Sequence, residues 1–188
     1  MRPAERRSTF SLWDISSRPD CSAGRWAVDF GDRTAEEAQE WPEPWSWIES
    51  KVKAERANAS AAVRQVPWWQ YWRRRPALYN SIASLDRVTV ITRVSKVVMP
   101  VMVPTGQVMS EQVVVFATDD TAMLALLSSA PHYWWTLTRA STLQTRVRYT
   151  PSDVFETLPL PELTSEIREL GDRLDTYRRE LMLAAKSA

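Results

Sequence analysis

Cysteine, histidine and glycine are scarce in this sequence, and each shortage excludes a class of site. Cys21 is the single cysteine and His132 the single histidine among 188 residues. An intrachain disulfide and a metal site built from several cysteines or histidines are therefore excluded. The four glycines lie far apart, so no glycine-rich loop is available to hold a dinucleotide or S-adenosylmethionine.

Catalytic motifs of nucleic-acid enzymes are missing as well. Neither the phosphate loop G-x-x-x-x-G-K-[ST] nor the Asn/Asp-Pro-Pro-Tyr/Phe tetrapeptide of amino-methyltransferases occurs. None of the four lysines stands in a Glu/Asp-x-Lys group within the β-rich region, as in a nuclease site. We interpret His132, between Pro131 and Tyr133, as a packed or helix-end histidine. We predict no catalytic residue, no metal ligand and no enzymatic activity of the chain alone.

Long apolar runs are absent too. No stretch reaches the ~18 residues that a membrane span needs. The basic residues 1–10 are not followed by an apolar stretch and a cleavage site, which argues against a signal peptide. We expect a cytoplasmic protein without a membrane partner, and the isolated Cys21 fits a reducing compartment.

Positive charge is concentrated in the middle of the chain. Residues 60–150 carry 10 Lys+Arg and 4 Asp+Glu, whereas both flanking segments are weakly acidic. Arginine presents a planar fork that fits phosphate and the guanine edge. A solvated face on a neutral protein is the alternative. Apart from Lys96, every basic residue of this segment is an arginine: Arg64, Arg73, Arg74, Arg75, Arg87, Arg93, Arg139, Arg146 and Arg148.

The patterning predicts an α+β fold: a small mixed or antiparallel sheet flanked by helices, with a projecting C-terminal helix. Thr34-Ala-Glu-Glu37 has the form of a capping box, and Asp119 or Asp120 is expected to cap a later helix. Further helices are expected over about 45–59, after the interruption by Pro42 and Pro44, and over 76–85. Runs rich in β-branched residues predict strands over 88–94, 97–103 and 113–117.

The last helix has a narrow apolar seam. Its spacings of 4, 3, 4, 3 and 4 residues are typical of a 3.5-residue repeat. We expect the seam to dock on another helix, in this chain or in a partner. Its members are Leu163, Ile167, Leu170, Leu174, Tyr177 and Leu181.

Two groups of residues are candidates for binding phosphate. Residues 68–75 form a cluster in which three tryptophans, Trp68, Trp69 and Trp72, precede Arg73, Arg74 and Arg75. Aromatic and arginine side chains together can stack on bases or hold phosphates, although we favour core packing for the tryptophans and leave both readings open for the arginines. The second group, Arg93, Ser95 and Lys96, lies between two predicted strands, where it can hold a phosphate or simply be solvated.

Residues 141–149 suggest a base-reading edge. In an extended segment, side chains alternate, so Gln144, Arg146 and Arg148 would project to one face. Glutamine pairs bidentately with adenine and arginine with guanine in the major groove. Three such side chains in one row are what a base-reading edge requires.

A series of phrases in fixed order resembles the target-recognition region of MmeI-type (type IIL) restriction–modification enzymes and related single-chain DNA methyltransferases. The resemblance covers roughly residues 12–165. The ending Leu158-Pro159-Leu160-Pro161 replaces the Phe-Pro-Phe/Trp-Pro of the family, a conservative packing change. The phrases are RWAVDF (25–30), VKAER (52–56), WWQY (68–71), RPALY (75–79), RVSK (93–96), LLSSAPHYW (126–134) and RYTPSDVFETLPLP (148–161).

The resemblance implies a fused architecture of nuclease, adenine-specific methyltransferase, recognition domain and helical tail. It also implies that Gln144 and Arg146 read bases, since the specificity-setting pair of the family lies just before its Arg-Tyr-Thr/Ser phrase. S-adenosylmethionine is expected in a partner or missing domain, not in this chain. The chain would be a separately encoded subunit, a split-gene remnant or an incomplete gene model.

Together these features predict a sequence-specific DNA recognition module of a restriction–modification or phage-defence system. Its partners would be double-stranded DNA and a methyltransferase subunit or domain. We divide the chain into a loosely ordered lead-in (1–24), a DNA target-recognition domain (25–160) and a C-terminal packing helix (161–188). Two alternatives stay open: part of an adenine-N6 methyltransferase that acts only with a separate catalytic chain, and a tryptophan-rich protein-interaction module without a DNA role.

Overall fold

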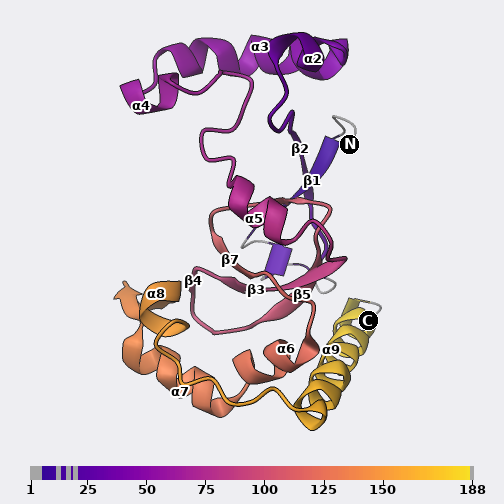
Figure 1. The fold of residues 1–188 in the computed structure, drawn as a ribbon, viewed down its shortest axis with the longest axis vertical. Helices are drawn as coiled ribbons and strands as arrows, with labels where there is room; N and C mark the ends of the chain where they lie inside the picture. Colours follow the sequence, from indigo (N-terminus) through magenta and orange to yellow (C-terminus); the bar gives the residue numbers. More distant parts are fainter. Residues whose placement is uncertain (1–5, 12–13, 16–17, 19–20, 187–188) are drawn as a thin grey trace.

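The computed structural model describes residues 6–11, 14–15, 18 and 21–186. Three small three-stranded sheets form the middle of the molecule, with short helices above them and four helices below (Figure 1). The expected α+β class is confirmed, although the strands divide among three sheets instead of forming one. Among the described residues, no helix is long and apolar enough to cross a membrane.

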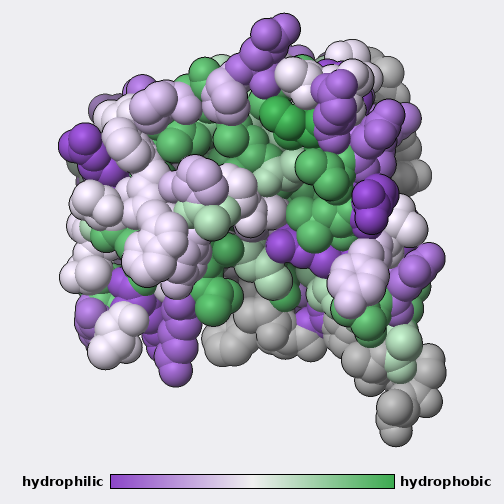
Figure 2. Space-filling model, turned by 90° about the horizontal axis from the view of Figure 1, so that it is seen from below, coloured by the Kyte–Doolittle hydropathy of each residue, from purple (hydrophilic) through white to green (hydrophobic). Residues whose placement is uncertain are grey.

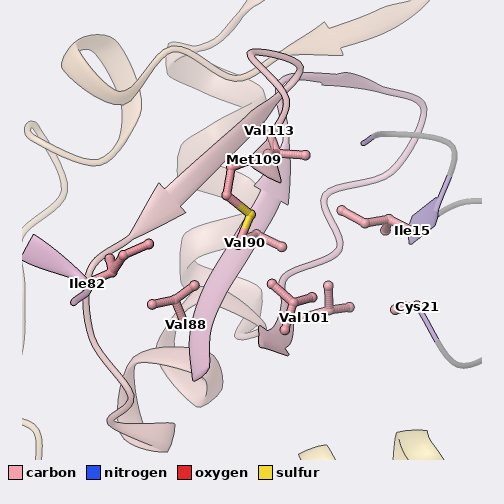
Figure 3. Close-up of a cluster of buried hydrophobic side chains, with 9 residues drawn as sticks. Ile15, Cys21, Ile82, Val88, Val90, Val101, Met109 and Val113 are labelled. Atoms are coloured by element: carbon pink, nitrogen blue, oxygen red, sulfur yellow. The ribbon is translucent and has the colours of Figure 1, made fainter. Parts of the chain in front are cut away.

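The central sheet is antiparallel and has the order β5 (Val101–Pro104), β3 (Arg87–Thr92), β7 (Val113–Phe116). The middle strand is buried on both faces after its first residue, which is why it is a continuous run of β-branched residues. Val88 and Val90 enter one apolar cluster, shown in Figure 3, and Ile91 enters a second cluster. The sheet therefore separates two cores.

The second sheet joins β2 (Arg25–Val28), β1 (Arg6–Phe10) and β6 (Val108–Met109). β1 pairs antiparallel with β2 and parallel with β6. The expectation of a loosely ordered lead-in is wrong for residues 6–10, because β1 is the central strand of this sheet. The lead-in residues 1–5, 12–13, 16–17 and 19–20 lie outside the described part of the chain.

The third sheet carries the predicted base-reading segment. It has the antiparallel order β4 (Val94–Ser95), β9 (Arg146–Arg148), β8 (Ser141–Leu143). β8 and β9 form a hairpin whose two-residue turn is Gln144-Thr145. This hairpin follows directly on the end of α7 (Ala130–Arg139).

The upper helices are α2 (Ala35–Gln39), α3 (Pro42–Ala57) and α4 (Ala61–Arg64). The capping box of Thr34 and Glu37 is confirmed. The expected break between two helices is confirmed at residues 40–41, but the second helix begins at Pro42 instead of Trp45, because prolines in a first helical turn remove only N–H groups that have no intrahelical partner. Beneath α3, Trp68 and Trp69 pack around a small core, which confirms their structural interpretation. Trp72 is 44% exposed, so core packing is wrong for this third tryptophan.

The helices α5 (Pro76–Ser81) and α6 (Thr121–Leu127) begin where the sequence predicts. Pro76 occupies the first turn of α5. The side chain of Asp120 caps α6 by accepting from the backbone N–H of Ala122 at 2.9 Å. The short helix α8 (Pro151–Val154) follows the hairpin.

The C-terminal helix α9 (Ser165–Lys186) packs along α6 (Figure 1), but not through the whole predicted seam. Leu170, Tyr177 and Leu181 are 55%, 60% and 51% exposed, and Figure 2 shows other hydrophobic side chains open to solvent on the lower face. Buried Gly171 faces α6 instead, because the two backbones meet too closely there for a larger residue. Leu163 precedes α9, so the seam prediction is wrong for four of its six members.

Candidate nucleic-acid interface

A groove of about 1150 Å³ separates the upper helices from the sheets. Its upper wall comes from α3 and α4 and its lower wall from β4, β6 and the β8–β9 hairpin. Residues 71–76, which connect the two levels, form its back. Six arginines and four carboxylates line the groove, so its local charge is positive.

The groove brings together five of the nine residues predicted to contact DNA. They come from three segments that are far apart in the sequence. Gln144, Ser95, Lys96 and Arg148 do not line it. The five are Arg73, Arg74, Arg75, Arg93 and Arg146.

The arginine triplet is engaged within the chain. Arg74 forms an ion pair with Asp32. The guanidinium carbon of Arg73 lies 4.5 Å from the centroid of the Trp72 ring. Its Nη1 lies 3.9 Å from a carboxylate oxygen of Glu111. Both ion pairs are exposed and so contribute little to stability. Their arginines remain available to a phosphate that replaces the carboxylate.

Arg75 has a structural role. Its backbone adopts a left-handed conformation (φ 51°) at the start of α5, which is uncommon for a residue other than glycine. Its half-buried guanidinium donates a hydrogen bond to the backbone carbonyl of Met109. Arg75 therefore holds α5 against β6, and only its remaining N–H groups can reach the groove.

Arg93 is the most available of the predicted phosphate contacts. Its side chain is exposed, and among the described residues it takes part in no ion pair. Its backbone is fixed at both groups: the N–H donates to Gln112 O at 2.7 Å, and the carbonyl accepts from the Tyr149 N–H at 2.8 Å. A fixed backbone with a free guanidinium suits a side chain that binds an anion.

The register of the third sheet places Arg146 and Arg148 on one face. Arg148 stands opposite Val94 on one side and Ser141 on the other, and Arg146 stands opposite Leu143. Directly opposed residues share a face. Val94, Leu143 and Arg146 all line the groove, so this face is turned toward it.

Gln144 is not in an extended segment, and the prediction of one row of three side chains is wrong. It is the first residue of the hairpin turn and has a positive φ of 58°. Two-residue hairpin turns require such a conformation because it matches the twist of the strands. The turn sets the exposed Gln144 side chain at the tip of the hairpin, apart from Arg146 and Arg148.

Ser95 and Lys96 lie at the far edge of the same sheet. Ser95 stands opposite Val147, so it lies on the face away from Arg146 and Arg148. Its hydroxyl accepts from the Val97 N–H at 3.3 Å. Lys96 is exposed beside it. The structure therefore separates these two residues from the arginines of the groove.

A buried His–Tyr pair supports the hairpin. His132 Nδ1 lies 2.7 Å from Leu127 O and Nε2 lies 3.0 Å from the Tyr149 hydroxyl. The carbonyl can only accept, so Nδ1 carries the proton and the Tyr149 O–H donates to Nε2. Tyr149 directly follows β9, and the pair ties the root of the hairpin to α7. The structural interpretation of His132 is confirmed.

Burial lowers the pKa of His132, so the ring is neutral in the folded chain. The unfolded chain takes up a proton below about pH 6.5 and the folded chain does so only at a lower pH. The free energy of unfolding should therefore fall by about 1 kcal/mol between pH 7.5 and 5.5. Denaturant unfolding at the two pH values measures this. His132→Gln should remove most of the pH dependence, and an equal fall in both proteins would contradict the assignment.

Several groove residues could not be predicted from local sequence patterns. Asp32 and Glu111 act as counter-charges to Arg74 and Arg73, and such long-range pairs leave no local pattern. Tyr71 also lines the groove, where burial, followed by the charge of Asp29, raises its pKa to about 12 and keeps its hydroxyl protonated. Within the described residues, no group of His, Cys, Asp and Glu is placed to hold a metal.

Comparison with known proteins identifies the family of the chain. The family model described as "MmeI, target recognition domain" matches residues 21–162. The chain is therefore a target recognition domain and belongs to the MmeI family of such domains.

A solved structure of the type IIL restriction–modification enzyme MmeI in complex with DNA has a similar fold, with a TM-score of 0.64 at 17% sequence identity. The match covers 97% of this chain and 23% of that chain. The chain thus spans about a quarter of the MmeI chain. No curated protein matches the sequence.

Proposed function

We propose that the chain recognises a specific sequence in double-stranded DNA and that the groove is its DNA-binding surface. The observation that carries the proposal is the convergence of arginines from three segments beside an exposed hairpin with two more predicted contacts. A target recognition domain needs both a phosphate-binding surface and a base-reading element. The groove and the hairpin supply one of each.

In this proposal, Arg73, Arg74 and Arg93 bind phosphate. Arg93 has no carboxylate partner to lose among the described residues, so it binds phosphate directly. Arg73 and Arg74 exchange Glu111 and Asp32 for phosphate oxygens. Because exposed ion pairs are worth only about 0–1 kcal/mol, the exchange costs little.

Base reading falls to the hairpin. Arg146 and Arg148 are two positions apart on one strand, a separation of about 6.6–6.8 Å. That distance is about two steps of 3.4 Å along a DNA strand, so Arg146 and Arg148 would reach base pairs two steps apart. Gln144 is exposed at the tip, and we propose that it contacts a base beyond them.

Methyl transfer belongs to a separate methyltransferase subunit or domain that binds S-adenosylmethionine. The lining of the groove supports this division, because it is rich in arginines, two of which pair with carboxylates. The chain alone is therefore a recognition module of a restriction–modification or phage-defence system. Its specificity takes effect through the catalytic partner.

Binding should weaken steeply with salt, because phosphate contacts release counterions. Roughly three to six contacts give a slope of about −3 to −5 in a plot of log affinity against log salt concentration. Fluorescence anisotropy with a labelled random duplex measures this slope. An affinity that does not change between low and moderate salt would contradict phosphate binding and favour the protein-interaction alternative.

Asp32→Asn sharpens that test. Removing the counter-charge of Arg74 should tighten duplex binding about two- to fivefold, the range of an exposed ion pair. Glu162→Gln is the matched control, since it removes one exposed carboxylate outside the groove. Equal effects of the two variants would show that only net charge matters.

A further inference from the structure

A second pocket, of about 660 Å³, lies under the N-terminal half of α3. Its floor includes Trp68 and Trp69, which pack edge to face with ring centroids 5.8 Å apart. Its rim includes Trp26 and Trp47, which are 71% and 58% exposed. Two large aromatic side chains are thus left open to solvent at the mouth of an aromatic pocket.

The pocket adjoins the groove. Val52, Arg56 and Tyr71 line both. α3 lines both: its first half faces only the pocket, and its second half contributes to the pocket and the groove. DNA bound in the groove therefore lies next to the pocket.

Polar groups stand at both ends of this aromatic surface. Arg56 Nη2 donates to Gln70 O at 2.9 Å, but its buried Nη1 has no hydrogen-bond partner in the described structure. A buried donor without a partner is costly and often marks a place where a ligand completes the bond. At the rim, the exposed carboxylate of Glu43 is an acceptor.

We propose that this pocket binds one unpaired nucleobase of the DNA that the groove holds. Tryptophan stacks on every base, because every base has a π face. After a small movement of the Arg56 side chain, its free N–H meets a ring nitrogen or carbonyl of the base, and Glu43 accepts from an exocyclic amine. A base within the duplex stack is covered on both sides, so only an unstacked base can enter. This inference rests on the proposed function.

The test compares two labelled duplexes of the same sequence, one fully paired and one with a central three-nucleotide bulge. By anisotropy, the full chain should bind the bulged duplex about tenfold more tightly, within the range for one stacked base. Trp26→Ala and Trp47→Ala should each reduce that preference to within about twofold and leave binding of the paired duplex nearly unchanged. Trp134→Ala, at another exposed tryptophan outside the pocket, is the matched control.

A bulge also makes a duplex easier to bend, which could by itself favour binding. The tryptophan variants therefore distinguish base binding in the pocket from an effect of bending. A preference retained in both Trp26→Ala and Trp47→Ala, or lost equally in Trp134→Ala, overturns the inference and leaves DNA binding by the groove intact. A parent chain that binds both duplexes equally also overturns it and leaves the pocket to a side chain of a partner protein. A parent that binds neither duplex overturns the proposed function itself.

Discussion

Arg146→Ala should relax the sequence preference of the chain at one base pair by about 1–3 kcal/mol, the value of one bidentate arginine–guanine contact. Affinity for random duplex should change only slightly, because the contact is to a base edge and not to a phosphate. Selection from a randomised duplex pool measures the preference. The same selection applies to the chain with any partner methyltransferase.

Two further arginine variants distinguish base recognition from phosphate binding. Arg74→Ala should weaken binding to all sequences alike, since its groove position serves phosphate contact. Arg173→Ala, exposed on α9 and outside the groove, should change neither quantity beyond the loss of one charge. If Arg146→Ala keeps the selected motif and loses affinity uniformly, the hairpin only binds phosphate and its base-reading role is refuted.

Gly171→Ala should destabilise the chain by about 2 kcal/mol or more, although alanine is the better helix former. An added Cβ would overlap the backbone carbonyl of Thr121, a group that cannot move without shifting α6. The nearby bonds from Arg168 to Asp120, at 2.7 and 2.9 Å, and from Thr121 Oγ1 to Arg168 O, at 3.2 Å, would be lost with the same movement. Denaturant unfolding followed by circular dichroism measures the effect.

Glu169→Ala is the control for that experiment. It lies on the exposed side of α9 within two residues of Gly171 and should leave stability within about 0.5 kcal/mol of the parent. Gly171→Ala with parental stability would show that α9 does not need its close approach to α6.

The sequence predicted those elements that depend only on residues close together in the chain. The β-branched run over 88–92, the capping box at Thr34 and the cap at Asp120 each depend on a few neighbouring residues. All three occur in the structure. The turn at Gln144-Thr145 could not be found in this way, because it lacks the Gly, Asn or Asp that usually marks a two-residue hairpin turn.

Features that depend on contact between two distant segments could not be predicted from the sequence. The apolar spacing of the last helix pointed to Leu170, but the approach of α6 selected its neighbour Gly171 for the buried position. The three arginine segments were each recognised as candidates. That they meet in one groove depends on the tertiary fold, as do the carboxylates Asp32 and Glu111 that face them.

The hairpin has a consequence for how such a domain diverges over evolutionary time. Its residues 141–146 are all exposed, whereas its root is fixed by the buried Tyr149 and His132. Substitutions at these exposed positions therefore cost little stability, except for β-branched residues at Gln144, whose positive φ disfavours them. Insertions and deletions are a different matter, because a two-residue turn sets the strand register and a slip of one residue reverses both faces. New sequence preferences should thus arise by exchange of side chains on a hairpin of constant length.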